Sequence, residues 1–382
     1  MTTGRQQVAN RMPYIDCLRA LACLAVIGQH TLILTPAPLV AGRAYGALEV
    51  IAGRGWLGVH LFLMLSGFCL YNGIIKRVAV EDATVEVKRF FTRRCTRMLP
   101  PYYVALGIFT AVAVATAIKH HIPISREFAG RFDIPAHLLM LHNLRPKIMF
   151  SIAGPFWSLA LECQLYLLFP LFVGIAARRG LGVLAVSTLA VAVIYQALVC
   201  RLIGSHPTDW RLFMAAYYAL PGRCFEFAIG MVAAALVARP IPNQNKIAAF
   251  LIVSLAVPAY LMTGDQLFYY PGRDQICGLL FACVAVLCTR IPIKVFSSKV
   301  LVLLENIGLV SYSIYLYHQP IIEALTPRRF RLLLSNDYTF LAFVVLRATL
   351  LVLVGAFMYR VWEKRWAEYR PGVKPDKKMV PN

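Results

Sequence analysis

Long apolar runs separated by short polar segments dominate the chain. Most runs are about 20 residues long, which is the length of a helix that crosses the roughly 30 Å hydrocarbon core of a bilayer. The pattern predicts an all-α polytopic membrane protein with about ten transmembrane helices. The predicted spans are 14–34, 56–75, 99–118, 155–176, 181–203, 212–238, 247–263, 274–289, 301–325 and 338–362.

The polar segments predict how these spans are oriented. Lys and Arg are enriched in cytoplasmic segments of membrane proteins. Most of the 39 basic residues fall in the segments that are cytoplasmic if the chain starts inside the cell. We therefore expect a cytoplasmic tail at 1–13, one transmembrane domain at 14–366 and a basic cytoplasmic tail at 367–382. The first run carries Arg19 and lacks a clean cleavage site, so we expect a transmembrane helix and not a signal peptide.

Composition narrows the possible functions. The 382 residues are 59% hydrophobic and 15% charged, far from the balance of soluble domains. The formal net charge is +21, but the basic residues lie between apolar runs, where they meet anionic lipid headgroups. We expect no nucleic acid binding. The ten cysteines form no CxxC pair and predict neither a disulfide framework nor a zinc site.

Three ionisable residues in the first predicted helix are candidates for chemistry. Ionisable groups within the membrane are costly, and each suggests a function. Arg19 and His30 lie eleven residues apart, so they share a helix face and stand about 16 Å apart along the axis. Asp16 is one turn before Arg19 and close enough to pair with it. The arrangement suits a long, thin donor with His30 as general base. The alternative is an interfacial ion pair and a histidine that bonds a neighbouring helix.

Two neighbouring segments offer further polar groups. His60 and Ser66 lie in the second span, where the small residues around Ser66 also suit close helix packing. Three arginines in the next basic segment could hold the phosphates of a nucleotide-bearing donor, or could be ordinary positive-inside charges. They are Arg93, Arg94 and Arg97.

Polar stripes also occur in later spans. Ser158, Glu162 and Tyr166 recur every four residues on one helix face, where they either bond one helix to another or line a site. Glu162 needs a partner or a proton if it is buried. Arg223 and Glu226 are spaced for a structural salt bridge.

The ninth predicted span and one outer loop hold most of the remaining histidines. Ser311, Tyr315 and His318 share a stripe, in which His318 either lines a site or is a satisfied hydrogen-bonding group. Four histidines on the predicted outer loop match no metal motif, and we expect them at the interfacial surface. They are His120, His121, His137 and His142.

Taken together, the motifs resemble the acyltransferase-3 family of bacterial membrane O-acyltransferases, the carbohydrate O-acetyltransferase type. The resemblance covers nearly the whole chain, and six or more motifs in the family's order make it specific. They are Arg19 with His30 after an Ile-Asp-x-Leu-Arg start, GVxLFxxLSGF at 58–68, RRxxRxLPPYY at 93–103, WSLxxE at 157–162, RxxEFxxG at 223–230, SYSxYLxH at 311–318 and WEKRW at 362–366.

The resemblance implies about ten helices in the bacterial cytoplasmic (inner) membrane, an acyl-CoA donor (usually acetyl-CoA) and a carbohydrate acceptor of the cell envelope. No metal is implied. The family's essential Arg and His carry over onto Arg19 and His30, and its cytoplasmic arginines onto Arg93, Arg94 and Arg97. Position 60 is His where many members have an acidic residue, which puts a catalytic acid there in doubt. Some members carry an appended esterase-like domain, for which we expect no room here.

The residues and the resemblance together lead to one hypothesis and two rivals. Donor phosphates bind near the three cytoplasmic arginines, the pantetheine arm passes Arg19, and His30 serves the acceptor hydroxyl as general base or through an acyl-His intermediate. The rivals are a transporter or flippase for glycan-lipid intermediates, for which we see no internal repeat, and a membrane sensor or scaffold. The acceptor sugar, the acyl length and the oligomeric state are not predicted.

Overall fold

The computed structural model describes residues 12–34, 46, 49–50, 52–75, 83–124, 128–204, 208–261, 270–326 and 337–367. Within these ranges every regular element is a helix and there is no strand, which confirms the all-α prediction for this part of the chain. The two predicted tails, 1–13 and 367–382, lie outside the described residues except at positions 12, 13 and 367.

Seven stretches of the described chain are long and apolar enough to cross a membrane. Their helices are α2 (Pro13–Leu34), α4 (Leu57–Ile75), α5 (Ala83–Lys119), α7 (Phe156–Arg179), α8 (Leu181–Ile203), the consecutive α9 (Trp210–Tyr217) and α10 (Leu220–Ala238), and α15 (Asp337–Met358), which continues through η7 (Tyr359–Glu363) into α16 (Lys364–Ala367).

An eighth crossing is formed if α13 (Lys299–Leu309) and α14 (Ser311–Ala324) count as one span. Two shorter helices, α11 (Gln244–Leu261) and α12 (Arg273–Cys288), coincide with the two remaining predicted spans. The helix α12 has only 16 residues. The count of ten crossings therefore stays a prediction, although a helix lies at every one of the ten predicted positions.

Two predicted spans are not straight helices. The segment 301–325 bends by 77° between α13 and α14. The hydroxyl of Ser311 donates to the carbonyl of Gly308 at 2.8 Å across this bend, which satisfies a backbone group that the break exposes. The segment 212–238 is interrupted between α9 and α10. Furthermore, α5 starts well before Pro100 and Pro101, where we expected the third span to begin.

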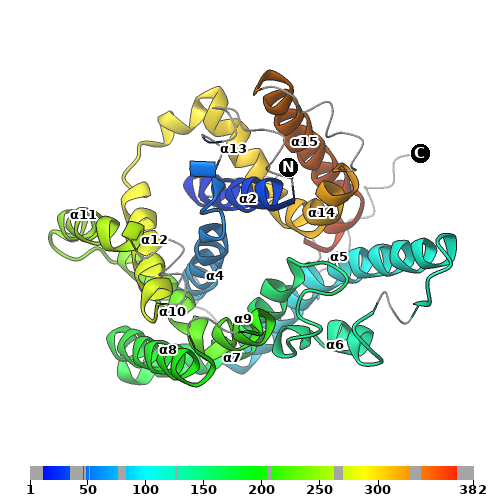
Figure 1. Ribbon diagram of the computed structural model, residues 1–382. Coiled ribbons are helices and arrows are strands. Elements are labelled where there is room, and N and C mark those ends of the chain that lie inside the picture. The colour runs from blue at the N-terminus through cyan, green and yellow to red at the C-terminus, as the bar shows by residue number, and fades with distance from the viewer. Residues whose placement is uncertain are drawn as a thin grey trace.

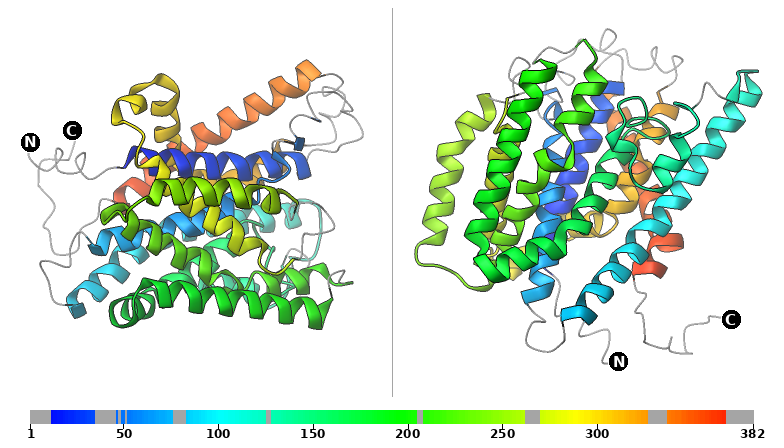
Figure 2. Two further views of the ribbon diagram at one scale, coloured as in Figure 1. Left: turned by 90° about the vertical axis from the view of Figure 1, so that its left-hand side faces the viewer. Right: turned by 90° about the horizontal axis from the view of Figure 1, so that it is seen from below.

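The helix α2 lies near the middle of the bundle in Figure 1, between α4 on one side and α13 and α14 on the other. Beyond α4 lies α10, which also packs against α8 and α12, and α11 covers α12. Figure 2 shows most of the long helices running roughly along a common direction, as expected of a membrane bundle. Within α2 only Leu21 and Ile33 are exposed, so its polar side chains are buried or half-buried.

Glycines allow the central helices to approach one another closely. An added Cβ at Gly67 of α4 would lie 2.0 Å from the carbonyl oxygen of Phe227 in α10, and one at Gly230 would lie 2.0 Å from that of Met64. The predicted close packing around Ser66 is confirmed at this neighbouring glycine. A Cβ at Gly308 would lie 1.8 Å from the Asp16 carbonyl oxygen, so α13 rests directly on the backbone of α2.

The beginning of α2 and the end of the described chain meet at the same corner. Gly308 contacts Asp16 in the first turn of α2, and Ser313 in the first turn of α14 donates to the carboxylate of Glu363 in η7 at 2.7 Å. Both ends of the transmembrane domain therefore lie at one end of the bundle. This arrangement is compatible with termini on the same side of the membrane, and which side that is remains a prediction.

Candidate active site

Two functional candidates on α2 face two different cavities. The predicted pair between Asp16 and Arg19 is present, with Arg19 Nη1 3.3 Å from Asp16 Oδ1. Arg19 lines a cavity of about 110 Å³ that we call the arginine chamber. His30 lines a second cavity of about 470 Å³ that we call the histidine chamber. Arg19 and His30, eleven residues apart on α2, therefore line different chambers.

The arginine chamber collects three cationic side chains. Arg19 of α2 is joined there by Arg94 and Arg97 of α5. Arg93 does not line this chamber, because consecutive helical positions point in different directions. Of the three predicted phosphate-binding arginines, the structure brings two together with Arg19. Cys69 also lines the chamber, with its sulfur 3.4 Å from Arg19 Nη2.

One wall of the arginine chamber is built around the carboxylate of Glu162. Ser66 donates a 2.5 Å hydrogen bond to Glu162 Oε1, and the hydroxyl of Tyr166 donates to the same oxygen. The guanidinium of Arg94 lies over the Tyr166 ring, 5.7 Å from its centroid. All four side chains line the chamber. The half-buried carboxylate of Glu162 therefore has hydrogen-bond partners in the structure.

The two chambers meet at Val59 and Tyr315, which line both of them. The hydroxyl of Tyr315 is 2.7 Å from that of Ser158. The Tyr315 ring lies 5.3 Å from the ring of His318, centroid to centroid. A thin molecule that extends from the arginine chamber toward His30 would therefore pass Val59 and Tyr315.

His30 is paired with His318 of α14. His30 Nδ1 lies 2.7 Å from His318 Nε2, and the two rings are stacked with centroids 4.9 Å apart. His318 is fully buried behind His30, and its Nδ1 is 2.8 Å from the backbone carbonyl oxygen of Tyr315. The structure thus brings together two residues that lie 288 positions apart in the sequence.

These contacts determine the tautomers of the neutral pair. A carbonyl oxygen only accepts hydrogen bonds, so the proton of His318 must be on Nδ1. Its Nε2 is then an acceptor, and the hydrogen bond between the rings requires the proton of His30 to be on Nδ1. The Nε2 of His30 is left with a free lone pair, which is the state that a general base needs.

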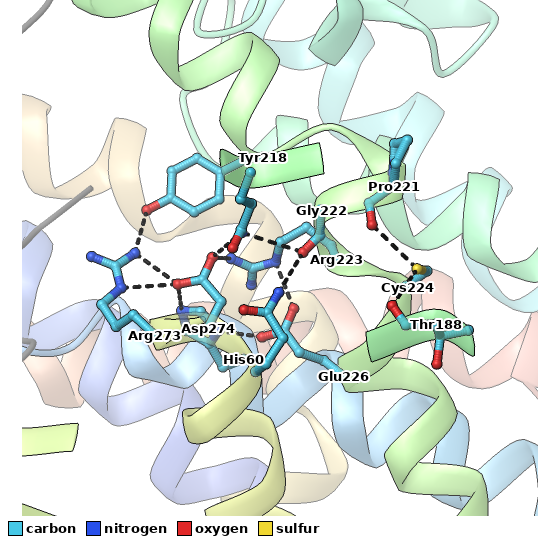
Figure 3. Close-up of polar contacts among 12 residues, drawn as sticks. His60, Thr188, Tyr218, Pro221, Gly222, Arg223, Cys224, Glu226, Arg273 and Asp274 are labelled. Carbon is cyan, nitrogen blue, oxygen red and sulfur yellow. Dashed lines mark hydrogen bonds and ion pairs between the residues drawn. The ribbon is translucent and has the colours of Figure 1, made fainter. Parts of the chain in front are cut away.

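A buried ionic cluster, drawn in Figure 3, contributes His60 and Arg223 to the lining of the histidine chamber. The predicted pair of Arg223 and Glu226 is present at 2.6 Å, and Arg223 also contacts Asp274 at 3.1 Å. Asp274 binds its neighbour Arg273 at 2.8 Å. His60 Nδ1 is hydrogen-bonded to Glu226, and His60 Nε2 is 3.8 Å from Asp274. Two cations thus face two carboxylates, which compensates their burial.

The expectation for the four loop histidines is only half right. His120 and His121 are exposed. By contrast, His137 and His142 are fully buried, and their rings stack with centroids 3.9 Å apart. They belong to a small cap of α6 (Asp133–Leu138) and η3 (His142–Leu144), which lies between two spans and covers their side chains. No group of three metal-ligating side chains was found among the described residues.

Several residues of the ionic cluster and of the histidine chamber were not predicted as site residues from the sequence. Arg273 and Asp274 stand at the start of a predicted span, where charged residues are ordinary. Three tryptophans that line the histidine chamber also stand at the starts of helices, where interfacial tryptophan is expected. They are Trp56, Trp157 and Trp210. Only their meeting in three dimensions distinguishes them from routine features of span ends.

The helices and the two chambers define a multi-pass membrane protein with a polar site buried in its bundle. The chain belongs to the acyltransferase-3 family, whose acyltransferase domain matches residues 12–360. This confirms the resemblance seen in the motifs.

Named relatives indicate the chemistry of the family. The chain is 27% identical to the peptidoglycan O-acetyltransferase OatA of Listeria monocytogenes over 83% of its own length and 50% of that protein. It is 28% identical to the putative peptidoglycan O-acetyltransferase YrhL of Bacillus subtilis, covering 83% and 49%. A putative acetyltransferase of Acidianus two-tailed virus is 27% identical, covering 81% and 83%. The chain spans about half the length of the two peptidoglycan relatives. No solved structure matches.

Proposed function

We propose that this chain is a membrane O-acyltransferase that moves an acyl group, in the first instance acetyl, from acyl-CoA to a hydroxyl of a cell-envelope carbohydrate. Membership of the acyltransferase-3 family and the printed activities of the relatives support the reaction class and peptidoglycan as the first acceptor to test. The observation that carries the proposal is the His30–His318 pair, which leaves a basic nitrogen facing a chamber next to a second, cationic chamber.

The donor is assigned to the arginine chamber. Arg94 and Arg97 suit the phosphates of coenzyme A, because guanidinium groups bind phosphate through charge-assisted hydrogen bonds. The pantetheine arm then passes Arg19 and places the thioester near Tyr315, where the chambers meet. The axial distance of about 16 Å between Arg19 and His30 suits this extended arm. The donor enters from the cytoplasm in this proposal.

The acceptor is assigned to the histidine chamber on the outer side. Nε2 of His30 removes the proton of the acceptor hydroxyl, whose oxygen attacks the thioester carbonyl. A carbon–oxygen bond forms, the carbon–sulfur bond breaks, and the proton passes from His30 to the leaving thiolate. An acyl-His30 intermediate is the alternative route, in which His30 Nε2 attacks the carbonyl first and the coenzyme A thiolate leaves as the carbon–sulfur bond breaks. The acceptor oxygen then attacks the acyl group, the carbon–nitrogen bond to His30 breaks, and the hydroxyl proton passes to the thiolate. His318 holds the His30 ring in the tautomer that both routes need.

The transporter hypothesis receives less support. Transport folds of this size are commonly built from internal repeats, and the sequence shows none. Family membership instead supports transfer chemistry. The two hypotheses differ in what a deletion strain makes: loss of transfer leaves exported glycan without its ester, whereas loss of transport leaves no exported glycan.

A variant series with mass spectrometry of the cell-envelope glycan tests the proposal. We expect His30→Ala and Arg19→Ala to lose the glycan ester while the purified proteins keep the wild-type elution profile and thermal transition. His120→Ala is the matched control, since His120 is an exposed histidine outside both chambers. Normal ester levels with a well-folded His30→Ala variant would overturn the proposal.

A further inference from the structure

The histidine chamber has an aromatic wall that the proposed chemistry does not use. Trp56, Trp157 and Trp210 line it from three different helix starts. Each indole is held by a neighbour. Phe150 stacks on Trp210 with centroids 5.5 Å apart, and Tyr218 packs on Trp157 at 5.2 Å. Trp157 and Trp210 are therefore each packed against another aromatic ring of the protein.

The third tryptophan is held by the ionic cluster. The guanidinium of Arg273 lies 4.3 Å from the Trp56 ring centroid, and the ring of His60 meets Trp56 edge-on at 5.1 Å. Cation–π contacts of this kind are most favourable on tryptophan. The same cluster that fills the interior thus fixes the position of an indole on the chamber wall.

The lining of the histidine chamber also includes uncharged polar side chains. Gln29 and Gln319 line the chamber, each next in sequence to one member of the histidine pair. Amide side chains both donate and accept hydrogen bonds, as hydroxyl groups do. The nearby cations Arg223 and Arg273 are balanced by Glu226 and Asp274. The charges are therefore balanced within this cluster, whereas Arg211, whose guanidinium lies 5.6 Å from the Trp210 ring centroid, stands outside it.

We infer that the histidine chamber is a saccharide-binding site that holds uncharged pyranose rings against Trp157 and Trp210. A pyranose has an apolar face that suits an indole and a rim of hydroxyls that suits amides. The volume of about 470 Å³ falls within the usual range of about 300–1,000 Å³ for ligand pockets. This inference rests on the proposed function for the identity of the acceptor, and it adds where and how the sugar is bound.

Tryptophan at helix ends also serves as a membrane-interface anchor. Two features favour a ligand site instead. The three indoles line one chamber, and this chamber also contains the basic nitrogen of His30. An interfacial anchor requires neither of these arrangements. Substituting a chamber tryptophan and a tryptophan elsewhere in the chain separates the two roles.

The test measures binding of an N-acetylglucosamine tetramer to the purified full-length protein by isothermal titration calorimetry. Binding is measured in the His30→Ala background, so that it does not depend on turnover. We expect Trp210→Ala to weaken binding by about threefold to tenfold, the range that aromatic contacts typically contribute. Trp157→Phe, which keeps a ring, is the second variant, with a smaller expected loss. Trp366→Ala, a partly exposed tryptophan outside both chambers, should bind as the parent does.

The results separate this inference from the proposed function. Weaker tetramer binding in Trp210→Ala, with an unchanged KM for acetyl-CoA in the protein that retains His30, supports the saccharide site. Binding of the tetramer to the protein that retains His30, with no acyl transfer from acetyl-CoA to the tetramer, supports the site and overturns the proposed reaction. Unchanged tetramer binding in both Trp210→Ala and Trp157→Phe overturns the site, as does tighter binding of an oligogalacturonate, which is anionic.

Discussion

At the scale of single residues, the proposed chemistry depends on the pairing of His30 with His318. His318 is fully buried and touches the substrate in neither route, so it is a positioning residue. Its Nε2 accepts a hydrogen bond from the Nδ1–H of His30, because its own Nδ1–H donates to the Tyr315 carbonyl oxygen. In the other tautomer of His30, Nε2 would carry the proton and could not accept one from the acceptor hydroxyl.

Substitution of His318 tests this tautomer argument. His318→Phe removes the acceptor, and we expect kcat to fall by about a hundredfold, as in the loss of general-base assistance. His318→Gln keeps a carbonyl oxygen that can accept a hydrogen bond from His30. We expect its kcat to be at least about tenfold higher than that of His318→Phe. The KM for acyl-CoA should be the same in both variants. Equal kcat values for the two would contradict a tautomer role and indicate packing alone.

At the scale of helices, close contacts between backbones determine which side chains can reach the chambers. Gly67 and Gly230 bring α4 and α10 together, and Gly308 brings α13 onto α2. Of the side chains on α4, Ser66 lines the arginine chamber and His60 lines the histidine chamber. Small residues at such contacts are a general device of membrane helix packing.

Two glycines of α4 allow a matched comparison. A Cβ at Gly67 would lie 2.0 Å from a backbone oxygen, whereas a Cβ at Gly73 meets nothing within 4 Å. We expect Gly67→Ala to destabilise the protein by about 1–3 kcal/mol through overpacking. Gly73→Ala should be neutral or slightly stabilising, because alanine favours helix. Thermal unfolding in detergent is the measurement. Equal midpoints for the two variants would mean that α4 and α10 are not in close contact.

At the scale of the whole molecule, the site depends on helices that are distant in the sequence. One ionic cluster joins α4, α10 and α12, and the histidine pair joins α2 to α14. Replacing one charge of the cluster would leave a buried charge without its partner, which is costly. The geometry of the candidate site and the stability of the whole bundle therefore depend on the same contacts.

Orientation across the membrane is testable with a natural cysteine. All ten cysteines are described, and Cys95 is the exposed one. Positive-inside charges predict that Cys95 faces the cytoplasm. A membrane-impermeant maleimide should therefore label the protein in inside-out vesicles and not in right-side-out vesicles, with the label lost in Cys95→Ser. His120→Cys in that background should show the opposite pattern. Labelling of Cys95 from outside would reverse the predicted topology.

The cap between α5 and α7 predicts a dependence on acidity. Burial lowers the pKa of His142 to about 3, so this histidine is neutral in the folded protein. For Asp133, burial alone would raise the pKa, but hydrogen bonds from His137, Ser151 and the Ala129 backbone N–H lower it. Both pKa values are depressed, so both groups stabilise the cap at neutral pH.

The sign of the effect follows from these shifts. The His142 contribution is complete above the pKa of an unfolded histidine, about 6.5. It is lost progressively as the pH falls toward about 3, its pKa in the folded protein. We expect the thermal midpoint to drop between pH 6.5 and 4, and His142→Leu to reduce that slope. An equal slope in the variant would show that the acid sensitivity comes from other groups.

The sequence by itself determined the features that depend on local chemistry. Apolar length places a helix at every predicted span, and helical periodicity puts Arg19 and His30 on one face and pairs Arg19 with Asp16. The motifs of the first helix and its neighbours identify the family. These properties need no knowledge of which helices are neighbours, because they follow from spacing along a single helix.

Only the tertiary structure decided what depends on neighbours. The partner of His30, the buried cluster around Asp274 and the shared chamber of three tryptophans join residues on different helices. The burial of His137 and His142 and the bend between α13 and α14 likewise depend on packing. Hydropathy and periodicity are properties of one segment, whereas these contacts arise from the way several segments are packed together.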